Sequence, residues 1–156
     1  MTLDPERDLE ITRIIKAPRS AVWDAWTKPE QFAKWWVPEP ETCRIVAMDL
    51  RPGGAMQTEI AAGPGETFGP HMSACYLDVV DGRRIVFTNA LVGGWRPAEQ
   101  PFITAIITLD DHDLGTAYRA VVMHKSPEDR QTHHDLGFYD GWGTVAAQLA
   151  KLVEQS

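Results

Sequence analysis

Four of the five histidines are the first candidates for chemistry: His71, His124, His133 and His134. A neutral imidazole can act as a general base near neutral pH or bind a metal ion. Because adjacent residues on a helix point about 100° apart, His133 and His134 cannot ligate one ion together. The sequence also lacks the HxH and HExxH spacings and any Cys-paired motif. We therefore expect no metal and no cofactor. The histidines are then either catalytic or structural, and structural histidines would lie at the surface or form hydrogen bonds within the fold.

The last predicted strand, Gly115–His124, offers two side chains that could handle a proton. Alternation along a strand places Tyr118 and His124 on one face. Arg119 lies on the opposite face, which indicates that the opposite face meets solvent. We expect Tyr118 and His124 to point inward, and they are the catalytic candidates. The sequence has no nucleophile elbow, no Ser/His/Asp order and no paired-carboxylate spacing, so it does not name a reaction.

The C-terminal segment changes to a helical period. Ser126 followed by Pro127 and two acidic residues is typical of a helix start. Beyond it, large apolar residues recur every three or four positions, which predicts one buried stripe: Phe138, Trp142, Val145, Leu149 and Leu152. Counting back along the same helix, Gln131 and His134 extend this face toward the N-terminal end.

The remaining elements supply a sheet for this helix to cover. Pro70 interrupts one strand and predicts a bulge or an edge position there. Two short helices rich in tryptophan follow the first strand. The predicted fold class is α+β, one domain over residues 1–156, in which a curved antiparallel sheet wraps around the long C-terminal helix. β-Branched runs and turn residues divide the sheet into seven strands: Leu9–Lys16, Thr42–Leu50, Ala55–Ala62, Thr67–Val80, Arg84–Leu91, Phe102–Leu109 and Gly115–His124.

Composition narrows the class of protein. The 156 residues are 44% hydrophobic and 24% charged, which is typical of a globular chain. A net charge of −7 argues against a nucleic-acid partner and against docking on an anionic membrane. The sequence has no apolar run of transmembrane length and no apolar segment of a secretory signal. Cys43 and Cys75 fit no metal spacing, and we expect free thiols and a cytoplasmic protein.

Several segments resemble the START-like, helix-grip superfamily (SRPBCC), and more narrowly the branch named for homologues of the heat-shock chaperone ATPase activator. The resemblance covers about residues 8–153 and depends on order and approximate spacing of these segments: Ile11–Arg13, Ala17–Glu30, Trp35-Trp36, Asp49–Gly54, Ile85–Thr88 and Gly137–Trp142. It implies a cavity between the curved sheet and the C-terminal helix. Proteins of this fold include lipid carriers, cyclases, hydrolases and co-chaperones, so the fold does not fix the function.

Given such a cavity, eight residues are predicted to line it. Trp36 precedes a proline and Trp95 lies in a glycine-rich loop, so both could stand at the entrance. Trp142 suits core packing or ligand contact. The other tryptophans of the short helices are expected to pack. The full predicted set is Trp36, His71, Trp95, Tyr118, His124, His134, Phe138 and Trp142.

The preferred function is the binding of an apolar or aromatic small molecule in this cavity. A cyclase- or hydrolase-like enzyme using the same cavity is one alternative. A co-chaperone-like stimulator of a chaperone ATPase, acting by protein contact, is another. We also expect a weak homodimer, and the loop that holds Trp95 could be either a contact surface or a lid over the cavity.

Overall fold

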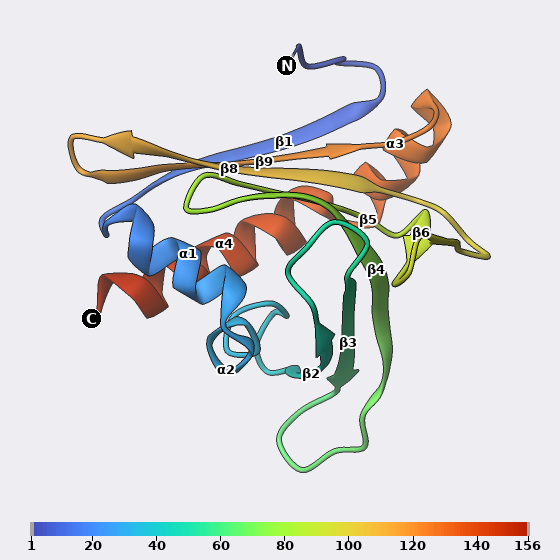
Figure 1. The fold of residues 1–156 in the computed structure, drawn as a ribbon, viewed down its shortest axis with the longest axis horizontal. Helices are drawn as coiled ribbons and strands as arrows, with labels where there is room; N and C mark the ends of the chain where they lie inside the picture. The colour runs from blue at the N-terminus through green and yellow to red at the C-terminus, as the bar shows by residue number, and fades with distance from the viewer. Residues whose placement is uncertain (1, 156) are drawn as a thin grey trace.

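The computed structural model describes residues 2–155, and its elements follow the predicted order (Figure 1). A first strand and two short helices precede a run of strands, and two helices end the chain. The bounds are β1 Asp8–Ile15, α1 Arg19–Thr27, α2 Pro29–Phe32, β2 Thr42–Met48, β3 Ala55–Ala61, β4 Gly69–Val80, β5 Arg84–Thr88, β6 Leu91–Val92, β7 Arg96–Pro97, β8 Thr104–His112, β9 Gly115–Met123, α3 Pro127–Asp135 and α4 Phe138–Glu154.

One antiparallel sheet of seven strands has the order β1-β9-β8-β5-β4-β3-β2. The chain returns at β9 to pair with β1, so the first and last strands of the sequence are neighbours. Figure 1 shows that the sheet is bent, with β1, β9 and β8 crossing above α4 while β2, β3 and β4 turn down beside it. The predicted α+β class, with a curved sheet around a C-terminal helix, is confirmed.

Three irregularities in strand pairing lie in the half of the sheet that turns down. The pairing register shifts between Ile45 and Ala47, between Thr58 and Glu59, and between Tyr76 and Asp78. A β-bulge bends its strand and increases the local twist. The second shift lies where Glu59 pairs with Pro70, which confirms the irregularity that this proline predicts.

Helix α4 fills the concave side of the sheet. Phe138, Val145 and Leu149 are buried, as the stripe predicts. Trp142 and Leu152 are only partly buried, although both pack against the core. The small residues Ala146 and Ala150 are also buried and allow the helix to approach its neighbours closely.

The two short helices hold a cluster of aromatic rings against the same core. Trp26 is at its centre, with ring centroids 5.4 Å from Phe32, 4.9 Å from Trp35 and 6.2 Å from Phe87 of β5. The Trp35 indole donates a hydrogen bond to the carbonyl of Ala25, at 2.9 Å. The predicted packing role of these tryptophans is therefore confirmed.

Two further expectations concern the cysteines and membrane segments. Both cysteines are free, and burial raises the pKa of the partly buried Cys43 thiol to about 11. Within residues 2–155, none of the helices has the length and hydropathy to cross a lipid bilayer.

The buried position of α4 gives a stability prediction. Leu149→Ala removes a fully buried side chain and should lower the free energy of unfolding by about 2–5 kcal/mol, because a cavity remains. Leu114→Ala makes the same chemical change at a side chain that is 61% exposed, and it should change stability by less than about 0.5 kcal/mol. Urea unfolding of both variants measures these values. Equal losses would show that α4 does not form the core described here.

Candidate ligand pocket

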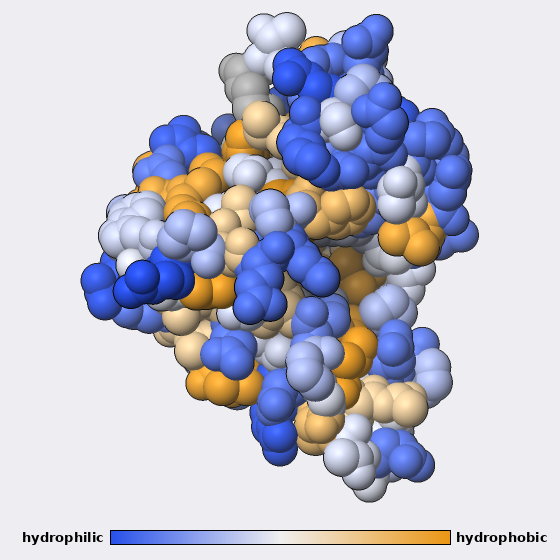
Figure 2. All heavy atoms as spheres, turned by 90° about the vertical axis from the view of Figure 1, so that its right-hand side faces the viewer, coloured by the Kyte–Doolittle hydropathy of each residue, from blue (hydrophilic) through white to orange (hydrophobic). Residues whose placement is uncertain are grey.

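A pocket of about 370 Å³ opens between the sheet and the start of α4. Its walls come from Trp36 and Pro38 after α2, from β4, from the segment between β5 and β8, and from the α3–α4 junction. Figure 2 shows hydrophobic atoms at the bottom of a hollow on the face that contains α3 and the hairpin β6–β7. Most lining side chains are apolar or aromatic, which is typical of a small-molecule site. The polar side chains in its wall are His71, Asn89 and His133, and Trp36 and Trp142 each add an indole N–H group.

The α3–α4 junction decides which histidine reaches this pocket. Gly137 has a left-handed conformation, with φ of 94°, and ends the regular helix begun at Pro127. The side chain of Ser126 caps α3 by accepting a hydrogen bond from the amide of Asp129, as predicted. Because the helix axis changes at Gly137, spacing counted back from Phe138 no longer applies to α3. His133 therefore lines the pocket, whereas His134 is exposed and contacts the ring of Tyr139.

His133 is joined to His124 and, through it, to the backbone before β1. The Nε2 atom of His124 lies 2.8 Å from Nδ1 of His133, and Nδ1 of His124 lies 2.8 Å from the carbonyl oxygen of Arg7. A carbonyl oxygen can only accept, so Nδ1 of His124 carries a hydrogen. The ring of Phe102 contacts both imidazoles, with centroids 5.4 Å from His124 and 5.1 Å from His133. Burial, together with the charge that His124 can carry, lowers the pKa of His133 to about 4.

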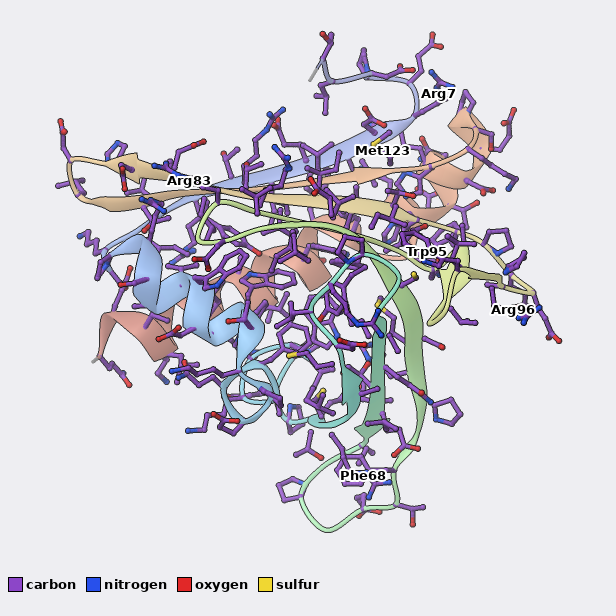
Figure 3. The ribbon with its side chains drawn as sticks, in the orientation of Figure 1. Arg7, Phe68, Arg83, Trp95, Arg96 and Met123 are labelled. Atoms are coloured by element: carbon purple, nitrogen blue, oxygen red, sulfur yellow. The ribbon has the colours of Figure 1, made fainter. Side chains whose placement is uncertain are left out.

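Backbone contacts fix α3, and with it His133. The guanidinium of Arg130 donates to the carbonyl of Asp8 in β1, at 2.9 Å. Figure 3 shows Arg7, the residue whose carbonyl accepts from His124, where β1 begins beside α3. Helix α3 thus bonds to the first residue of β1, while His124, which precedes α3, bonds to the residue before that strand.

Asn89 supplies a second oriented polar group. Its Oδ1 accepts from the amides of Phe102 and Ile103, at 2.9 and 2.8 Å. These two donors identify the oxygen, so the NH2 group is the side that remains, and it has no partner among residues 2–155. At the rim, Nδ1 of His71 lies 2.8 Å from the hydroxyl of Thr58. The His71 side chain is exposed, yet desolvation by its neighbours lowers its pKa.

Trp36 forms another part of the pocket wall. Its ring stacks on Phe32 with centroids 4.7 Å apart and meets Trp142 edge-on at 5.9 Å. Its indole N–H is buried and has no hydrogen-bond partner within the described residues. Gln148 of α4 fixes the segment that carries this tryptophan, because its amide donates to the carbonyls of Trp35 and Val37 and accepts from the amide of Glu39.

The structure thus brings four of the eight predicted cavity residues to the pocket wall: Trp36, His71, Phe138 and Trp142. His124 is 7% exposed and lies behind His133, in contact with it. Tyr118 is buried, as the strand alternation predicts, but lies outside this wall, and burial raises its hydroxyl pKa. The two catalytic candidates are therefore not neighbours of one ligand space.

Trp95 also lies away from the pocket wall. It belongs to the small hairpin β6–β7, a region predicted as a loop, and it has a positive φ of 64°. A Cβ placed on Gly53 would be 2.4 Å from the Trp95 Nε1 atom, so the indole covers that turn. Figure 3 shows Trp95 at the hairpin beside Arg96, and its side chain is 52% exposed.

Sequence reasoning missed His133 and Asn89 as pocket residues. The sequence marks His133 as one of four histidines that could act as a base or a metal ligand, but a continuous closing helix would place His134, not His133, on the face toward the cavity. Gly137 was the available signal, since glycine after a helical segment commonly marks its end. Within residues 2–155, no group of three metal-ligating side chains is present.

The lowered pKa of His133 predicts a pH effect on stability. The unfolded chain binds a proton at this residue below about pH 6.5, whereas the folded chain resists protonation until about pH 4. The unfolded state holds more protons in that interval, so stability falls as the pH decreases through it. Between pH 7 and 5, the free energy of unfolding should fall by about 1–2 kcal/mol more for the unchanged protein than for His133→Asn. The asparagine amide can still donate a hydrogen bond to His124, so this variant removes the titrating group but keeps the donor.

Urea unfolding across this pH range measures the effect, and His134→Asn is the control at an exposed neighbour. Parallel stability profiles for the protein and His133→Asn would contradict the prediction.

A family model described as "Activator of Hsp90 ATPase homolog 1-like protein" matches residues 16–154. A crystal structure of a protein from Nitrosomonas europaea is 40% identical, with a TM-score of 0.88 over 98% of this chain and 97% of that one. A crystal structure from Chromobacterium violaceum is 26% identical, with a TM-score of 0.72 over 94% and 97% of the two chains.

An AHSA1-like protein from Aeromonas hydrophila, solved by NMR, is 18% identical with a TM-score of 0.67 over 95% of this chain and 92% of that one, and it supports the fold alone. No protein of curated function matches the chain. The family match covers the two short helices, every strand of the bent sheet except β1, and both C-terminal helices. The chain therefore belongs to the family of activator of Hsp90 ATPase homologue 1-like proteins, within the helix-grip fold.

Proposed function

We propose that this protein binds a neutral, mainly aromatic small molecule in the pocket between the sheet and α4. The observation that supports this most directly is the pocket itself, about 370 Å³ with aromatic walls and a few fixed polar groups. That volume is within the range of small-ligand sites, roughly 300–1,000 Å³. None of the described side chains in its wall belongs to Lys, Arg, Asp or Glu. A charged ligand would lose its hydration there without gaining a counter-ion.

The aromatic walls indicate a flat ring as the ligand's main part. Trp36, Phe102, Phe138 and Trp142 all line the pocket, and Phe138 and Trp142 are stacked with centroids 5.6 Å apart. Aromatic side chains give a large contact area with preferred stacked and edge-on geometries. An apolar ligand of this shape would replace water that forms few hydrogen bonds with these walls.

Proton-transfer chemistry has less support from this geometry. Tyr118 lies outside the pocket wall, and burial raises its pKa, which keeps its hydroxyl protonated. His133 reaches the pocket, but with a pKa near 4 it is a weak base at neutral pH. We therefore favour ligand binding over the cyclase- or hydrolase-like alternative.

Gly141 provides a test, because it lines the pocket on α4 and a Cβ there would meet no heavy atom within 4 Å. Gly141→Leu should fill the pocket and weaken binding of a neutral aromatic probe, the methyl ether of β-naphthol, at least about tenfold. It should not unfold the protein, since leucine has the higher helix propensity. A titration followed by NMR, using the indole N–H signal of Trp36, measures the affinity.

Gly143→Leu is the matched control. Gly143 lies two residues along the same helix, a Cβ there also meets no heavy atom within 4 Å, and it does not line the pocket. Its variant should bind the probe as the unchanged protein does. If the unchanged protein does not bind the probe, or if both variants bind it equally well, the pocket is not the ligand site.

A further inference from the structure

The hydrogen bonds behind the pocket wall impose one direction on the imidazole pair. The carbonyl of Arg7 accepts from Nδ1–H of His124, so a neutral His124 has its lone pair on Nε2. That lone pair faces Nδ1 of His133 at 2.8 Å, so His133 must donate from Nδ1. A neutral His133 then has its lone pair on Nε2. The backbone carbonyl thus determines, through two rings, that the last nitrogen of the pair is an acceptor.

This last nitrogen is available to a ligand. His133 lines the pocket, and its Nε2 has no partner among residues 2–155. This nitrogen is not fully enclosed by protein atoms, so part of its surface remains accessible. Burial keeps the ring neutral at physiological pH by lowering its pKa to about 4. The pocket wall therefore presents a neutral, strongly oriented acceptor among aromatic side chains.

We propose that the ligand is a phenol, a neutral aromatic ring whose hydroxyl group donates a hydrogen bond to Nε2 of His133. This inference rests on the proposed function, because it specifies the ligand class of the same pocket. A hydroxyl suits the wall better than an N–H group, since its oxygen can also accept from the free NH2 group of Asn89.

Other ligand classes fit this wall less well. A ketone or an ether has no hydrogen to donate, so its binding would bury the lone pair of His133 without a partner, at a cost. A carboxylate would place its charge beside that lone pair, with no cation in the wall. Specificity of this kind comes from a polar group that only the right ligand satisfies.

The direction of the imidazole pair can be tested without any ligand. Nitrogen-15 NMR of the histidine rings at pH 7 distinguishes protonated from unprotonated ring nitrogens. We expect Nδ1 to be protonated and Nε2 unprotonated in both His124 and His133. A hydrogen on Nε2 of His133 would overturn the inference and leave the proposed function intact.

The ligand class is tested by comparing β-naphthol with its methyl ether, which differ by the hydroxyl hydrogen and one methyl group. The unchanged protein should bind β-naphthol about tenfold more tightly, as expected for one hydrogen bond to an otherwise unsatisfied acceptor. His133→Asn keeps a donor toward His124 but withdraws the acceptor from the pocket, so the preference should fall to about twofold or less. His134→Asn is the control and should keep the full preference.

The outcomes separate the two proposals. If both compounds bind the unchanged protein with equal affinity, or His133→Asn keeps the preference, the phenol inference is wrong while the pocket remains a ligand site. If neither compound binds, both proposals are wrong. Loss of preference in His133→Asn but not in His134→Asn, together with the expected nitrogen-15 pattern, supports the inference.

Discussion

The aromatic contact between the short helices and the core is the interaction on which the rest of the structure depends. Trp26 packs on Phe32, Trp35, Trp36 and Phe87, which joins α1 and α2 to the sheet. These rings fill one end of the concave face, and Trp36 then contacts Trp142 of α4 at their boundary. The pocket is the part of the same concave face that the cluster leaves open, with Trp36 belonging to both.

The polar wall depends on a second constraint, the break between α3 and α4. Had the helix continued through residue 137, α3 would have extended along the axis of α4 instead of packing beside β1. The left-handed conformation of Gly137 redirects the chain, and Arg130 then bonds to the carbonyl of Asp8. His133 and His124 meet only in this arrangement. Hydrophobic packing forms the pocket, but one glycine positions the imidazole pair in its wall.

Local signals in the sequence predicted the framework better than the site. Turn residues and β-branched runs located all seven sheet strands, and the stripe from Phe138 to Leu149 identified the buried face of α4, because both patterns are local and repeated. The missed features are tertiary. The choice of His133 over His134 follows from the redirected axis at Gly137, and the position of Trp95 over Gly53 follows from a contact between distant turns. Asn89 is oriented by the amides of Phe102 and Ile103, which no periodicity indicates.

The electrostatics of the pocket favour ligand binding over proton-transfer catalysis. A catalytic base needs a pKa near the working pH, whereas burial moves that of His133 far below it. The same burial makes the imidazole a reliable acceptor, since it stays neutral and its tautomer is determined by the carbonyl of Arg7. The hydrogen-bonded pair therefore presents the neutral ring of His133 to the pocket as an acceptor of fixed direction. Its energetic effect is to penalise any ligand that leaves Nε2 of His133 without a hydrogen, and selectivity of this kind requires no charged group in the wall.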